Sequence, residues 1–64
     1  MSSLQQLSSK TAKLVYLYLT ERGAATADEL AAALDEQLLT LLPVLATLEE
    51  RGLVTTTDGA YVPA

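Results

Sequence analysis

The sequence contains neither cysteine nor histidine, and these absences remove side chains on which many small enzymes and metalloproteins depend. Without cysteine, neither a disulfide nor a thiolate metal site can supplement the core. Without histidine, the usual general base and the commonest metal ligand are both missing. A chain of 64 residues also leaves little room for a substrate cleft. We therefore expect no enzymatic activity, no cofactor and no bound metal.

Positive charge is scarce as well. Lys10, Lys13, Arg22 and Arg51 stand against eight acidic residues, so the formal net charge is −4. A nucleic-acid-binding module normally carries a basic patch, because contacts to phosphate supply much of its affinity. The composition therefore gives little support to a strongly DNA-binding surface.

Long apolar runs are absent too. The longest, Leu14 to Leu19, is far shorter than the roughly 20 residues of a membrane-spanning helix. Residues 1–9 lack both the basic segment and the apolar segment of a secretion signal. We expect a single cytoplasmic domain that has no contact with a membrane.

The first predicted helix begins at Ser8, with Leu7 before this capping residue, and runs to Arg22, where Gly23 ends it. Residues 1–7 are expected to form a flexible arm ahead of a domain that spans 8–64. Helical periodicity predicts an inward stripe made of Ala12, Val15, Tyr16 and Leu19.

The second helix carries a capping box, in which Thr26 and Glu29 satisfy each other's backbone amides, and it should end near Asp35. Its inward face consists of Ala27, Leu30, Ala31 and Leu34.

The third helix is predicted over 38–51, before Gly52, with a core stripe of Leu38, Leu41, Leu45 and Leu48. Pro43 within this segment allows two interpretations. Either the helix is kinked at Pro43, or it begins later with Thr40 as its cap.

Two short β-prone runs follow, residues 53–57 and 60–62, on either side of Asp58-Gly59, and Pro63 ends the second. Asp-Gly tolerates the positive φ angles of a type I′ turn, so these runs predict a hairpin. The predicted fold is mainly α with a small β-hairpin. Three helices followed by a two-stranded wing are typical of a winged helix-turn-helix.

Two stretches carry a family resemblance: Asp28-Glu-Leu-Ala-Ala-Ala-Leu34, and Leu45-Ala-Thr-Leu-Glu-Glu-Arg-Gly-Leu-Val54 followed by Asp58-Gly59. They resemble the winged-helix transcription regulators of the MarR and TrmB type over residues 8–62. The resemblance implies transcription regulation through binding of double-stranded DNA, with the third helix in the major groove.

The outer side of that helix would present Leu39, Thr40, Pro43, Thr47 and Glu50, which is a poor set of donors for base edges. The DNA-binding candidates are Ser9, Lys10, Lys13, Thr26, Thr40, Thr47 and Arg51. Some of these candidates also have a purely structural explanation. The two lysines can be solvated surface residues, and Thr26 is a helix cap.

A surplus of apolar residues predicts contact surfaces on two helices, because contiguous exposed apolar surface marks an interaction site. The predicted interface residues are Leu14, Leu17 and Tyr18 on the first helix and Leu39, Leu42 and Pro43 on the third. The first set predicts a homodimer, unless the N-terminal arm with Leu4 and Leu7 covers it. The second set supports an alternative function, an adaptor that binds a protein partner and not DNA.

Overall fold

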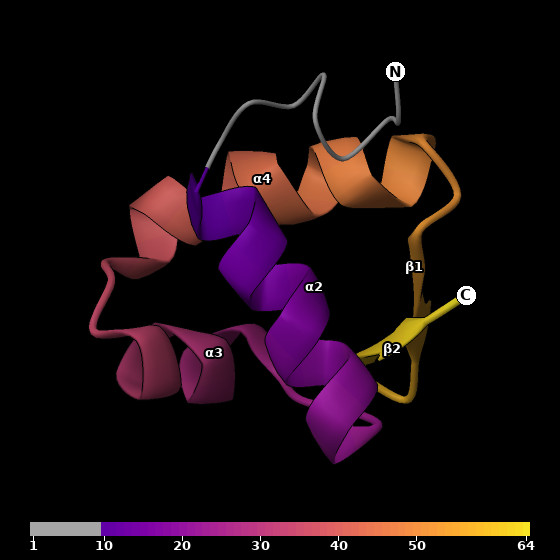
Figure 1. Cartoon of the computed structure of the whole chain (residues 1–64), viewed down its shortest axis with the longest axis horizontal. Coiled ribbons are helices and arrows are strands. Elements are labelled where there is room, and N and C mark those ends of the chain that lie inside the picture. The colour runs from indigo at the N-terminus through magenta and orange to yellow at the C-terminus, as the bar shows by residue number, and fades with distance from the viewer. Residues whose placement is uncertain (1–9) are drawn as a thin grey trace.

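The computed structural model describes residues 10–64, in which the helices and strands follow the predicted order (Figure 1). Helix α2 spans Lys10–Arg22, α3 spans Ala27–Leu34 and α4 spans Leu38–Glu50. The antiparallel strands β1 (Val54–Thr57) and β2 (Ala60–Pro63) form the wing. The winged-helix prediction is confirmed, whereas the Ser8 cap and the arm over residues 1–7 lie outside the described residues.

Helix α3 begins with the predicted capping box. The Glu29 amide donates to the Thr26 hydroxyl at 3.1 Å, and the Thr26 amide donates to Glu29 Oε1 at 2.8 Å. The helix ends at Leu34, where Asp35 adopts a left-handed conformation with φ of 53°. The capping box and the left-handed Asp35 confirm both predicted ends of α3.

Helix α4 begins at Leu38 with Gln37 as its N-cap, so the prediction of a later start at Thr40 is wrong. The helix continues through Pro43, which has no amide hydrogen to donate to the Leu39 carbonyl. Leu38 was expected in the core and is instead 38% exposed. Leu38 is the first residue of α4, and Leu41 is the first fully buried residue of that helix.

A glycine-dependent cap joins α4 to the wing. The Gly52 amide donates to the Glu49 carbonyl and the Leu53 amide to the Leu48 carbonyl, the pair of bonds that defines a Schellman motif. Gly52 has φ of 76°, which glycine adopts without a steric penalty. The cap turns the chain so that Val54 enters β1 as a buried residue.

The wing turns at Asp58 and Gly59, which both have positive φ as a type I′ turn requires. Its second strand also pairs beyond the hairpin: the amides and carbonyls of Ala25 and Tyr61 exchange two hydrogen bonds, at 3.0 and 2.8 Å. This bridge ties the α2–α3 connection to the wing. No side-chain pattern in the sequence predicts this bridge, because backbone groups alone form it.

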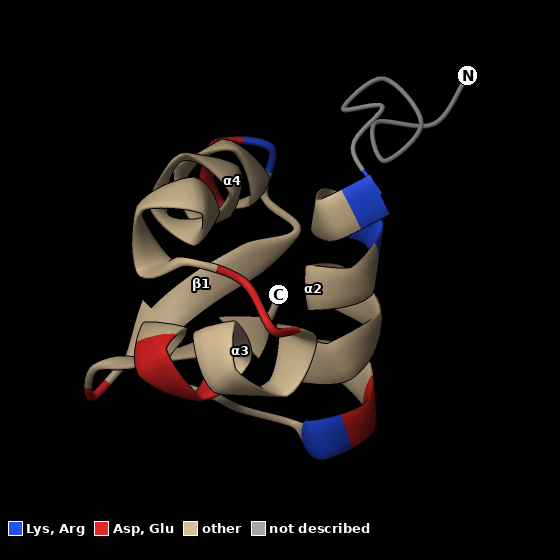
Figure 2. Cartoon of the chain, turned by 90° about the vertical axis from the view of Figure 1, so that its left-hand side faces the viewer, with Lys and Arg blue, Asp and Glu red and all other residues tan. Residues whose placement is uncertain are grey.

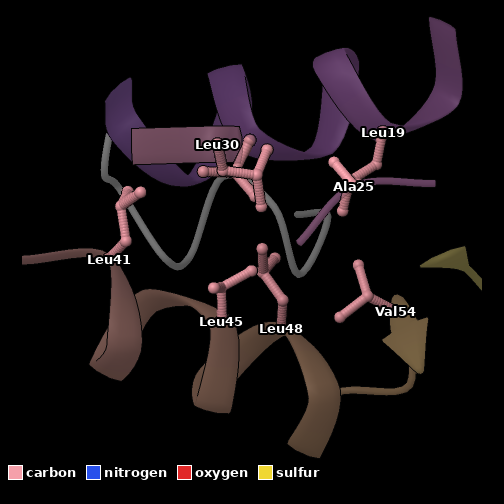
Figure 3. Packing of buried hydrophobic residues seen from close by; sticks show 8 residues of the cluster. Leu19, Ala25, Leu30, Leu41, Leu45, Leu48 and Val54 are labelled. Atoms are coloured by element: carbon pink, nitrogen blue, oxygen red, sulfur yellow. The ribbon is translucent and has the colours of Figure 1, made fainter. Parts of the chain in front are cut away.

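The core is aliphatic and centres on α4. Figure 3 shows leucine side chains of α4 pointing towards α2 and α3, with Val54 and Ala25 closing one end. The buried cluster consists of Val15, Leu19, Ala25, Leu30, Leu41, Leu45, Leu48 and Val54. Full burial of one such leucine contributes about 1.5–3 kcal/mol to the free energy of unfolding.

Within residues 10–64, no single helix has the length and apolar character needed to cross a bilayer. Taken together, α3 and α4 reach that length and composition, but the pair is bent by 117° at its break.

Two of the left-handed helix ends, Asp35 and Gly52, generate a prediction. Gly52→Ala should lower the free energy of unfolding by about 1 kcal/mol, because alanine is strained at positive φ. Outside the two neighbouring residues no atom lies within 4 Å of the added methyl group, so a clash with another part of the fold does not contribute. Asp35→Gly should raise stability by about 0.5–1 kcal/mol, since it removes both the strain and a negative charge at a helix C-terminus. Urea denaturation of both variants measures these changes, and changes of the same sign would contradict the explanation.

Candidate functional site

The outer side of α4 is largely apolar, as its sequence predicts. Leu39 is 79% exposed, and Pro43 and Ala46 continue the same side at helical spacing. Thr47 departs from the prediction that it faces solvent. It is half-buried, and its hydroxyl donates to the Pro43 carbonyl at 2.9 Å. Thr40 is therefore the more accessible of the two predicted threonines.

The N-termini of α3 and α4 differ in what they offer to an anion. The backbone amides at a helix N-terminus favour negative charge. In α3 the Thr26 hydroxyl and amide both take part in the capping box, and Asp28 lies in the first turn. In α4 the N-cap Gln37 makes no side-chain capping bond. The structure thus places Thr26 in a structural cap beside acidic side chains.

Lys10 and Lys13 lie exposed at the start of α2. They are three residues apart on a helix, so their side chains are neighbours. Between them in the chain, Ala12 is buried and lines a shallow hollow of about 170 Å³ with Pro43, Val44 and Thr47 of α4. The lysine pair therefore lies on the helical turn that packs against the middle of α4.

Acidic residues occupy other parts of the surface (Figure 2). They lie at the end of α2, at the start of α3, in the α3–α4 loop, at the end of α4 and at the wing tip: Glu21, Asp28, Glu29, Asp35, Glu36, Glu49, Glu50 and Asp58. The Glu49 carboxylate accepts a 2.6 Å hydrogen bond from the Thr56 hydroxyl and so joins α4 to β1. In residues 10–64 no three acidic side chains are grouped to hold a metal ion.

The two arginines lie away from the lysine pair. Arg51 is the C-cap residue of α4, at the opposite end from its N-terminus. Arg22 ends α2, with its guanidinium carbon 5.7 Å from the centre of the Tyr18 ring. Lys10 and Lys13 are thus the two neighbouring cations in the described part of the chain. The predicted Ser9 lies outside it.

The predicted contact face of α2 is present in part. Leu14 and Leu17 are 45% and 56% exposed. Tyr18, expected to face outward with them, is half-buried and packs against the core cluster. The helical period shows that Tyr18 lies at the edge of this face, but it cannot show that neighbouring elements cover that edge.

The arrangement contains two surfaces of different chemistry, which adjoin at the hollow between Ala12 and Pro43. One is the lysine pair at the start of α2, and the other is the apolar outer side of α4 with Leu38, Leu39, Leu42, Pro43 and Ala46. Leu38 and Ala46 were not among the predicted interface residues. Their signal was available in the helical spacing from Leu39 and Leu42.

A family model described as the N-terminal phage replisome organiser matches residues 2–63 of the chain. No curated protein and no solved structure matches it. The family match and the three helices with their hairpin support a small DNA-binding domain of winged-helix type. The match does not confirm the narrower resemblance to MarR and TrmB regulators.

Proposed function

We propose that this chain, which belongs to the N-terminal phage replisome organiser family, holds duplex DNA mainly through phosphate contacts at the start of α2. The observation that carries the proposal is the family match over residues 2–63 of a winged-helix fold. From the family's name we take the wider role, which is to help assemble replication proteins on DNA.

The charges of the domain favour phosphate contacts over base contacts. Lys10 and Lys13 form one exposed pair, whereas the outer side of α4 has few groups that hydrogen-bond to base edges. Contacts to phosphate position a protein on DNA but carry no sequence information directly. We therefore propose weak binding with limited sequence preference, and with a shallow salt dependence because few cations contact phosphate.

A homodimer would raise this affinity, because a second copy supplies a second lysine pair without any new type of contact. The exposed Leu14 and Leu17 lie on the same helix as the lysines and are the proposed contact. The net charge of −4 on each copy opposes association, so we propose a weak dimer.

Transcription regulation is the second candidate function, and it requires sequence preference. The exposed Thr40 near the start of α4 is the observation that favours it, since a threonine hydroxyl can hydrogen-bond to a base edge.

Lysine substitutions test the phosphate contacts. Lys10→Gln and Lys13→Gln should each weaken binding to a labelled duplex and flatten the slope of log affinity against log salt by about one. The slope of the unmodified chain should lie between about −2 and −4. Arg22→Gln is the matched control, because it removes the same charge from the other end of α2. Fluorescence anisotropy at several salt concentrations measures all four proteins.

Equal losses in the three variants would mean that only net charge matters, and would contradict a localised contact. No binding at about 100 μM protein and low salt, where non-specific binding of DNA normally registers, would contradict the proposed function itself.

A charge introduced at Leu17 tests the proposed dimer. Leu17→Glu should convert a weak dimer to a monomer at about 1 mM in sedimentation equilibrium, because burying an unpaired carboxylate is costly. Ala33→Glu adds the same charge to an exposed position of α3 and should leave association unchanged. A monomeric mass for the unmodified chain at this concentration would contradict the dimer.

Thr40→Ala tests base readout. Selection from a random duplex library should yield a different preferred sequence for Thr40→Ala than for the unmodified chain, because base contacts carry the specificity. Thr20→Ala, on the exposed surface of α2, is the control. Identical preferences in all three proteins would contradict the regulator function and leave the phosphate contacts unaffected.

A further inference from the structure

The outer side of α4 forms a continuous apolar surface that the phosphate contacts do not use. Leu39 is 79% exposed and Leu42 is 42% exposed. Pro43 lies four residues after Leu39, and Ala46 lies three residues after Pro43, so the three share one side of the helix. Exposure of a large leucine to this extent is a cost that a binding partner would remove.

Acidic side chains bracket this apolar side. Asp35 and Glu36 lie in the loop directly before α4, and Figure 2 shows this loop on the face towards the viewer. At the other end Glu50 continues the stripe of Leu39, and the helical rise places it about 16 Å away along the axis. Arg51 next to Glu50 offsets part of the charge at that end. The stronger negative charge therefore lies at the start of α4.

Three kinds of occupant fit this surface poorly. DNA phosphates would be repelled by Asp35 and Glu36, and leucine cannot hydrogen-bond to base edges. A second copy docked symmetrically would bring the same acids together. The segment 1–9 of this chain contains no charged side chain and so offers no cationic side chain to complement the acids.

We propose that the outer side of α4 docks a cationic amphipathic helix of another protein. The partner would place apolar residues at helical spacing over Leu39, Leu42 and Pro43, with a lysine or arginine towards each acidic end. This is helix recognition through apolar anchors with charge complementarity at the rim. The surface is one face of a helix of thirteen residues, well below a standard interface, so the complex should be weak and transient.

This surface lies on α4, whereas the phosphate contact lies on the turn of α2 whose Ala12 lines a hollow together with Pro43. DNA and a protein helix would therefore be held as neighbours on this domain. Such an arrangement suits the assembly role proposed above, but the docking surface does not depend on DNA binding.

The test uses the full chain labelled with ¹⁵N and two synthetic peptides of about 18 residues. Both peptides carry the same leucine face, one with lysines at both ends and the other with glutamates. The lysine peptide should shift the amide signals of Leu39, Leu42 and Ala46. Leu39→Ser should weaken its binding about tenfold, because a largely buried contact is lost. Glu36→Lys should weaken it several-fold, and more at low salt than at high salt.

Two α2 variants are the matched controls. Leu17→Ser and Glu21→Lys change an exposed leucine and an exposed glutamate of α2, and they should leave peptide affinity unchanged. All four substitutions are at exposed positions, so the dispersion of the amide spectrum should confirm that each variant folds.

Four results would overturn the proposal: no response of α4 to the lysine peptide, equal binding of the glutamate peptide, shifts centred on Leu14 and Leu17, or displacement of the peptide by duplex DNA. An α4 surface covered by residues 1–9 would give the first result, and an α4 surface that binds DNA would give the last. Adding duplex DNA to the same sample reports separately on Lys10 and Lys13. Failure of the docking surface is thus distinguished from failure of DNA binding.

Discussion

Leu41, Leu45 and Leu48 of α4 are fully enclosed, and the residues that enclose them come from α2, α3, the Ala25 bridge and the wing. A domain of 64 residues buries a smaller share of its surface than a larger one, so its stability margin is small. Truncation of one buried leucine to alanine typically costs about 2–5 kcal/mol, which is a large part of the total stability of such a domain. The packing of α2, α3 and the wing around one core depends on keeping this side of α4 covered.

Because one side of α4 is buried in the core, only its opposite side is left to bind a partner. The opposite side carries Leu39, Pro43 and Ala46, with acidic residues before and after. A winged helix usually offers this side to the major groove, but here its chemistry suits a protein better than a nucleic acid. The exposed pair of neighbouring cations, Lys10 and Lys13, lies on α2 instead. Fold and surface chemistry therefore support different partners for different helices.

The local features of the fold could be predicted because each depends on a few adjacent residues. Thr26 and Glu29 form their capping box within one turn of helix. Gly52 adopts the positive φ that ends α4, and Asp58-Gly59 turns the wing. In each case the side chain or the backbone preference acts on its own neighbourhood, so no knowledge of the tertiary structure is needed. The same holds for the order of elements and hence for the winged-helix fold.

The sequence by itself thus determined the helix ends, the turns and the angular position of each side chain around its helix. Only the tertiary structure decided which part of each helix is covered. Leu38 has a core-like spacing but lies exposed at the first residue of α4, and Thr47 is half-buried beside α2. The Ala25–Tyr61 bridge joins residues 36 positions apart through backbone groups alone, so no side-chain pattern indicates it. Periodicity describes one helix at a time, whereas burial depends on where the other elements pack against it.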